Sequence, residues 1–289
     1  MAAAPCLLRI EYLVTMAHRR HLPITLTVAG SDSGGGAGVQ ADLKTFAALG
    51  VHGTSALTCL TAQNPKGVTA IQSARPAVVR AQIEAVFAEL RPNAVKTGML
   101  FDTAIIRTVA GFVSSLRGPK PPLIVDPVMV ATSGARLLKP AALRAMQDEL
   151  LPLATLVTPN LDEAEILVGA RLKTVADLQA AARAIHQRFH CAALVKGGHL
   201  REQHEATDIF FDGKTELLLA APFVRGVSTH GTGCTYSAAI AAYMALGNKL
   251  PRAVQLAKRF ITRAIAGSVR AGGHSVLNSF AGAPRSVKI

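Results

Sequence analysis

Residues 229–234, with the sequence Thr-His-Gly-Thr-Gly-Cys, have the residue types of an anion-binding site. They lead into an apolar helix expected over about residues 233–246. Backbone N–H groups at a helix start have no acceptor within the helix, and with the positive end of the helix dipole they bind anions such as phosphate oxygens. Cys234 lies in the first turn, where the same field is expected to lower the thiol pKa and favour the thiolate. The motif predicts a base beside an anion-binding site; a buried structural cysteine is the alternative.

A second group of polar residues supplies carboxylate and amide oxygens. Asp126 follows an apolar run at residues 123–125, while Asn160 and Glu163 follow another at 155–158 and open a helix. Mg²⁺ prefers such oxygen ligands and keeps most of its waters, so these residues are candidates for holding a hydrated magnesium ion. The alternative is structural: Asn160 as the N-cap of the helix, with Glu163 completing a capping box.

Two lysines and a glycine-rich loop are further candidates. Lys196 follows the apolar run 192–195, and its charge suits nucleotide phosphates. Lys258 lies on a closing basic helix, where a solvated helix face explains it without function. Residues 30–38 are expected to form a Gly-rich loop. Its glycines would allow the backbone to approach a ligand closely; the alternative is an ordinary loop between a strand and a helix. The loop fits neither the P-loop nor the G-x-G-x-x-G pattern.

The elements expected to position these residues alternate between strands and helices. The expected strands are 24–29, 54–61, 94–96, 123–125, 155–158 and 192–195, with a hairpin at 207–212 and 216–221; the expected helices are 39–49, 76–90, 102–116, 233–246 and 251–271. This alternation predicts an α/β fold with a mostly parallel sheet and helices on both faces. Ligands of such sheets bind beyond the carboxyl ends of the strands, so Asp126, Asn160, Glu163 and Lys196 are expected to meet there.

Composition limits the class of protein. Half of the 289 residues are hydrophobic and 17% are charged, which is typical of a globular chain. No apolar run approaches the roughly 20 residues of a membrane span. Four scattered cysteines predict reduced thiols, with neither disulfides nor a zinc site. We expect a disordered extension at residues 1–22, or a start at Met16, followed by a single domain over residues 23–289.

The net charge of +13 raises the question of nucleic acid. Much of this charge lies in residues 249–289, which contain eight Lys and Arg but no Asp or Glu. A basic closing helix suits a polyanion such as ATP, and also non-specific nucleic-acid binding. Because the chain lacks interleaved aromatic residues and a nucleic-acid module, we expect no nucleic-acid partner.

Seven segments in order resemble the hydroxymethylpyrimidine/phosphomethylpyrimidine kinases, a branch of the ribokinase-like superfamily. They are AGSDSGGGAGVQADLKT at residues 29–45, AQN at 62–64, KTGML at 96–100, DPVM at 126–129, TPNLDEA at 158–164, VKGGH at 195–199 and THGTGCT at 229–235. The resemblance spans about residues 24–270. It implies a three-layer ribokinase-like sandwich.

The resemblance also implies roles for individual residues. For catalysis it indicates Cys234 with Gly231, Thr232 and Gly233; for the pyrimidine Gly30, Asp42, Gln63 and Met99; for the nucleotide Asn160, Lys196, Thr229 and Lys258; and for the metal Asp126 and Glu163. Most ribokinase-like sugar and nucleoside kinases have Asp at the position of Cys234. Cysteine there is typical of the pyrimidine kinases and of some bacterial pyridoxal kinases.

The activity implied is a pair of phosphoryl transfers from ATP with Mg²⁺ in thiamine biosynthesis. The first acceptor is 4-amino-5-hydroxymethyl-2-methylpyrimidine and the second is its monophosphate. A cytoplasmic homodimer is expected. A pyridoxal kinase of the same fold and a non-catalytic nucleotide-binding module are the alternatives. The tail at residues 273–280 departs from the Gly-Pro-Val-Asn-His type common in the family, so no role over the nucleotide is inferred for it.

Overall fold

The fold is built on one large sheet. The computed structural model describes residues 21–129, 140–198, 200, 205–224, 226 and 230–282. Eight strands lie in the order β10-β9-β8-β7-β6-β5-β1-β2, parallel from β8 to β2 and antiparallel at β9 and β10. They are β1 (Ile24–Ala29), β2 (His52–Leu57), β5 (Ala94–Thr97), β6 (Leu123–Val125), β7 (Leu156–Val157), β8 (Ala192–Lys196), β9 (Glu205–Phe211) and β10 (Glu216–Pro222).

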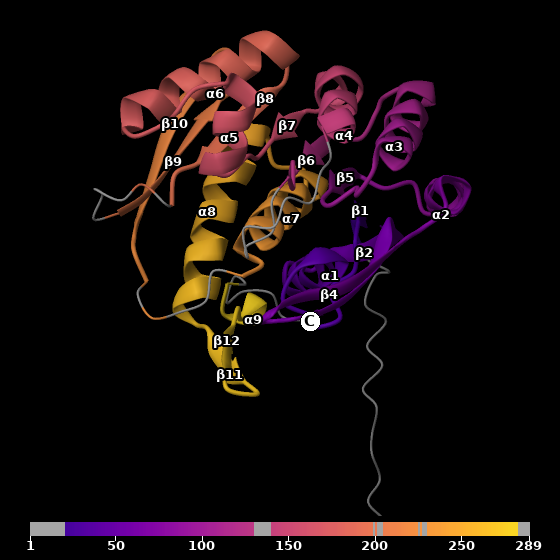
Figure 1. Cartoon of the computed structure of the whole chain (residues 1–289), viewed down its shortest axis with the longest axis horizontal. Coiled ribbons are helices and arrows are strands. Elements are labelled where there is room, and N and C mark those ends of the chain that lie inside the picture. Colours follow the sequence, from indigo (N-terminus) through magenta and orange to yellow (C-terminus); the bar gives the residue numbers. More distant parts are fainter. Residues whose placement is uncertain are drawn as a thin grey trace, which may run out of the picture.

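Helices cover both faces of this sheet, which confirms the expected three-layer α/β sandwich (Figure 1). One face carries α1 (Gly38–Ala48), α7 (Thr232–Ala245) and α8 (Leu250–Ala266). The other carries α2 (Pro76–Glu89), α3 (Thr103–Ser115), α4 (Pro140–Ala145), α5 (Leu161–Val168), α6 (Val175–Phe189) and the short turns η1 (Met146–Leu150) and η2 (Leu151–Leu153). Within the described ranges, no helix combines the length and the apolar character needed to cross a membrane.

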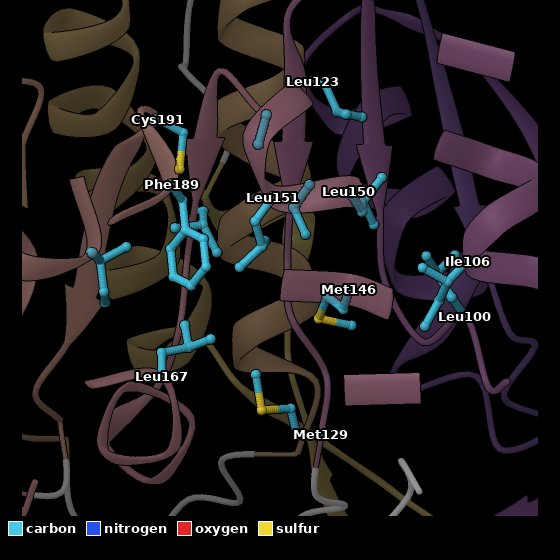
Figure 2. Packing of buried hydrophobic residues seen from close by; sticks show 14 of the residues in the cluster. Leu100, Ile106, Leu123, Met129, Met146, Leu150, Leu151, Leu167, Phe189 and Cys191 are labelled. Carbon is cyan, nitrogen blue, oxygen red and sulfur yellow. The ribbon is translucent and has the colours of Figure 1, made fainter. Parts of the chain in front are cut away.

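The two hydrophobic cores follow from the alternation of side chains along each strand. In β6, Leu123 and Val125 belong to the core under α2 to α6, whereas Ile124 belongs to the core under α1, α7 and α8. Strands buried on both faces therefore appear in the sequence as uninterrupted apolar runs. Figure 2 shows part of the first core, where Leu150 and Leu151 pack with other apolar side chains of the cluster.

The prediction of a single strand over residues 54–61 is wrong, because the chain passes from one sheet to another within this segment. The polypeptide bends at Thr58, whose hydroxyl donates to the Met99 carbonyl at 2.6 Å. After the bend, β3 (Cys59–Asn64) pairs with β4 (Gly67–Ser73) in a separate two-stranded sheet.

The closing helix is shorter than the expected 251–271. α8 ends at Ala266, and the chain continues as a hairpin of β11 (Val269–Ala271) and β12 (His274–Val276), followed by α9 (Ser279–Gly282). A β-carbon added at Gly267 would lie 2.5 Å from the Ala281 methyl group, because α9 folds back on the end of α8. The other strands and helices expected from the sequence are confirmed to within a few residues.

Candidate active site

Four parallel strands deliver one polar side chain each to the same region. In β5 to β8, Ala94, Ile124, Leu156 and Leu194 belong to the core under α1, α7 and α8. Two residues further along, on the same face of the sheet, the four strands or their first following residues carry, in order, Lys96, Asp126, Thr158 and Lys196. The change from apolar to polar at the carboxyl ends of the strands creates a polar floor below α1 and α7.

A cavity of about 470 Å³ opens above this floor, which is a common size for a small-molecule site. It brings together most of the predicted site residues: Gly30, Gln63, Met99, Asp126, Asn160, Glu163, Lys196, Gly231, Thr232, Gly233, Cys234 and Lys258. Thr229 lies outside the described residues. Asp42 is described but is not among the lining residues.

The start of α7 faces the cations and carboxylates of the floor. Gly231 adopts φ of +80° and approaches the carbonyl oxygen of Gly36, which only a residue without a side chain allows. The amides of Gly233 and Cys234 precede the first intrahelical bond, from Thr235 to Gly231. They are therefore in the positions where helix N–H groups bind anions.

Gly233 also marks where that helix start meets the polar floor. A β-carbon added there would lie 3.2 Å from Lys196 Nζ and 3.8 Å from Asp126 Oδ2. Lys196 Nζ donates to Asp126 Oδ1 at 3.1 Å. The helix start, an ammonium group and a carboxylate thus share one end of the cavity.

Asp126 and Glu163 differ in how their oxygens are used. Asp126 Oδ1 accepts from Lys196 and, at 3.2 Å, from Thr158 Oγ1, while Oδ2 faces Gly233. Glu163 Oε2 accepts from the Asn160 amide at 2.9 Å and Oε1 from the Met129 amide at 3.3 Å. The capping box expected for Asn160 and Glu163 is present. Burial raises the pKa of Glu163 to about 7, Lys196 opposes that shift and Asp126 adds to it.

The carboxylate oxygens of Asp126 and Glu163 suit Mg²⁺ better than a metal ion that takes all of its ligands from protein side chains. No cluster of three His, Cys, Asp or Glu side chains able to hold a metal occurs among the described residues. Mg²⁺ is commonly bound through one or two carboxylates, with waters and substrate phosphates completing its shell. Asp126 Oδ2 matches that requirement most directly.

Lys258 is tied into the cavity wall and is not a solvated residue on the helix face. Its ammonium group donates to Asp208 Oδ2 at 2.7 Å and to the Ala206 carbonyl at 2.8 Å. Asp208 in turn accepts from the Gly197 amide at 3.1 Å. The pair joins α8 to β9 and places a second cation at the cavity that Lys196 also lines.

The opposite part of the cavity is formed by the first loop and the β3–β4 sheet. Gly30 donates to the Met99 carbonyl at 3.1 Å, and an added β-carbon at Gly30 would lie 2.9 Å from Met99 Cε. Gln63 follows an irregularity in β3 and reaches His230 at 3.5 Å. His230 also contacts Asp32 Oδ2 at 3.1 Å, a link that the sequence interpretation did not assign.

Asp42 lies beneath the cavity, where it pairs with Lys96. Both side chains are 0% exposed, and Lys96 Nζ lies 3.0 Å from Oδ1 and 2.9 Å from Oδ2 of Asp42. Lys96 lines the cavity. The sequence interpretation quoted Lys96 within a motif but gave it no role, although a lysine inside a buried strand was a signal that it needs a partner.

The expectation that the helix field lowers the Cys234 pKa is wrong. Burial raises the pKa of the thiol to about 11, the Lys96 charge opposes this rise, and Asp126 and Asp42 add to it. The amide of Gly38 also favours the thiolate, but burial dominates. The thiol is therefore the main species at neutral pH.

Comparison with known proteins assigns the family. A profile of the phosphomethylpyrimidine kinase family matches residues 32–278. The chain belongs to this family. The hydroxymethylpyrimidine/phosphomethylpyrimidine kinase of Rhizobium meliloti is 50% identical over 248 residues, covering 86% of this chain and 92% of the relative. The enzyme of that name from Synechococcus elongatus is 47% identical over 260 residues, covering 90% and 98%.

Solved structures give the same fold. An ADP complex of Bacillus subtilis pyridoxal kinase matches this kinase with a TM-score of 0.82 at 36% identity, covering 90% of this chain and 98% of that one. A phosphomethylpyrimidine kinase from Clostridium difficile matches with a TM-score of 0.75 at 42% identity, covering 84% and 99%. The sandwich is therefore ribokinase-like, and the chain is a phosphotransferase.

Proposed function

We propose that this kinase transfers phosphate from ATP to 4-amino-5-hydroxymethyl-2-methylpyrimidine and then to the resulting monophosphate, as a step in thiamine biosynthesis. The observation that carries the proposal is the cavity that joins the start of α7 with Lys196 and Asp126 at one end and Gly30, Gln63 and Met99 at the other. Cys234, in the first turn of α7, lines the same cavity.

The nucleotide phosphates are bound by Lys196 and the amides of Gly233 and Cys234, with Asn160, Thr229 and Lys258 as further nucleotide residues. Cations and preorganised amides favour the charge that spreads over the transferring phosphoryl group. Magnesium, held through Asp126 and near Glu163, would neutralise phosphate charge when bound. Gly30, Gln63 and Met99 hold the pyrimidine, to which an amide side chain offers both a donor and an acceptor.

In the first transfer the hydroxymethyl oxygen forms a bond to the γ-phosphorus while the bond from that phosphorus to the leaving oxygen of ADP breaks. The hydroxyl proton goes to the Cys234 thiolate. Because burial raises the thiol pKa to about 11, this thiolate is the minor species at neutral pH, and the thiol must first release its own proton to solvent before it can accept the hydroxyl proton. In the second transfer the acceptor is a phosphate oxygen that is already anionic and needs no base.

A homodimer and a cytoplasmic location stay predictions. Size-exclusion chromatography with light scattering tests the first, and fractionation of the producing cell tests the second.

The test of the main proposal is ADP release measured separately with the alcohol, the monophosphate and pyridoxal as acceptors. Turnover of both pyrimidine compounds well above turnover of pyridoxal is expected. The alternative is a pyridoxal kinase, which the TM-score of 0.82 to enzymes of that name favours. Preference for pyridoxal, or no acceptor-dependent ADP release, would refute the pyrimidine assignment.

A further inference from the structure

Two apolar side chains of the β3–β4 sheet line the cavity and keep about a third of their surface exposed. Val68 is 37% exposed and Ile71 is 36% exposed. Apolar surface left in contact with water is unfavourable, and a ligand that covers it with an apolar group gains binding free energy. These two residues therefore mark a part of the cavity wall that suits an apolar group of a ligand.

A bulge in β4 places the two side chains on the same face of the hairpin. In a regular strand, residues three positions apart point to opposite faces. The pairing of β3 with β4 shifts between Ala62 and Gln63, which leaves Thr69 as an extra residue in β4. Val68 and Ile71 consequently share one face, and Val68 is the cross-strand partner of Gln63. All three of these side chains line the cavity.

Hydrogen bonds to the first loop fix the position of the hairpin at the cavity. Ser33 Oγ donates to the Gln63 carbonyl and accepts from the Gln63 amide, both at 2.7 Å. Thr61 Oγ1 donates to the Ser31 carbonyl, also at 2.7 Å. The hairpin is therefore held at the same part of the cavity as Gly30, which the proposed function assigns to the pyrimidine.

The proposed acceptor carries an apolar group on the side of the ring that would face this wall. Its methyl group at C2 and its hydroxymethyl group at C5 lie at opposite corners of the six-membered ring. The hydroxymethyl oxygen must face the start of α7 to receive the phosphoryl group. The methyl group then points away from α7, toward the part of the cavity formed by the first loop and the β3–β4 sheet.

We infer that Val68 and Ile71 are specificity-determining residues that bind the 2-methyl group of the pyrimidine, next to the amide side chain of Gln63. The inference rests on the proposed function, because it assigns a subsite to the proposed acceptor. The methyl group removes apolar surface of both residues from water, which favours the methylated ring over one that carries hydrogen at C2. The alcohol and the monophosphate share this methyl group, so both acceptors depend on the two residues.

Substitution by Thr tests the subsite, because Thr is a good strand residue that adds a hydroxyl group to the apolar wall. Calorimetric titration in the absence of ATP measures the Kd of 4-amino-5-hydroxymethyl-2-methylpyrimidine and of the same compound without its methyl group. Val68→Thr and Ile71→Thr are each expected to raise the Kd of the methylated compound about tenfold, because the methyl group covers the new hydroxyl without offering it a hydrogen-bond partner. The Kd of the compound without the methyl group is expected to change less than about threefold, because water fills the space and bonds to the hydroxyl.

Leu60→Thr is the matched control, because Leu60 is 52% exposed on the same hairpin but is not among the residues that line the cavity. It is expected to leave both Kd values unchanged. Titration with ADP confirms that each variant is folded, and either of the two Thr variants at the cavity decides the question by itself. Equal weakening of both compounds, unchanged affinity for the methylated compound, or the same selective effect from Leu60→Thr overturns the inference. Acceptor-dependent ADP release by the wild type tests the proposed function independently of these binding ratios.

Discussion

Replacement of Glu163 by Gln tests the electrostatics of the site through stability. Glu163 is 2% exposed, and its two oxygens accept from the amides of Asn160 and Met129. Burial raises its pKa from 4.5 to about 7, although Lys196 opposes the shift. Gln has the same shape but does not titrate.

Proton linkage gives the sign and the size of the effect of Glu163 on the free energy of unfolding. Because the folded-state pKa is raised, the folded chain binds more protons than the unfolded chain between pH 4.5 and 7. The free energy of unfolding of the wild type therefore falls as pH rises through this window, by about 3 kcal/mol from the Glu163 contribution. The Glu163→Gln variant is free of this loss, but its side chain offers one oxygen to two amides, which costs about 1 kcal/mol at every pH.

Urea denaturation of both proteins at several pH values from 4.5 to 8 measures the difference. The variant is expected to gain about 3 kcal/mol relative to the wild type across this range. Glu165→Gln, on the same helix, controls for loss of an acidic side chain as such. A difference between wild type and Glu163→Gln that stays constant with pH would refute the raised pKa and the burial argument behind it.

Three further substitutions test other parts of the site. Cys234→Ala is expected to slow the first transfer about 10²- to 10⁴-fold and the second much less; equal slowing in steady-state assays contradicts the base role. Gly231→Ala is expected to lower the melting temperature well beyond Gly247→Ala, because Gly247 has a similar φ of +85° but no atom within 4 Å of an added β-carbon. Lys258→Met leaves Asp208 buried without its cation and is expected to cost about 3 kcal/mol or more in urea denaturation. Adding Asp208→Asn should restore part of that loss, and no recovery would contradict the pairing.

Much of the sheet was predictable, because its inner strands are buried on both faces. Residues 123–125 and 192–195 are uninterrupted apolar runs that end in a polar residue, and both became strands that end at the cavity. The local sequence was also enough to predict Asp102 as the N-cap of α3, where its side chain accepts a hydrogen bond from the Ile105 amide. Helix α6 was not predicted, although Thr174 and Asp177 form its capping box.

The differences between prediction and structure come from contacts that only the tertiary structure holds. Asp42 and Lys96 are 54 positions apart, and nothing in either local pattern says that they pair under the cavity. The Cys234 prediction considered the field of its own helix but not its burial, which depends on packing against other elements. The bend at Thr58 likewise depends on a contact with Met99 from a different strand end.

Three buried lysine–aspartate pairs of the described residues lie at or directly below the cavity. They are Lys96 with Asp42, Lys196 with Asp126 and Lys258 with Asp208. An unpaired lysine in such a buried position would lose its charge, because desolvation favours the neutral amine. For Lys96 and Lys196 the neighbouring carboxylates raise the pKa above its ordinary value against the effect of burial, so both ammonium groups stay charged. Lys196 and Lys258, which keep some exposure at the cavity, are therefore already in place for a phosphate-rich substrate, and the charge that develops during transfer meets groups that need little reorganisation.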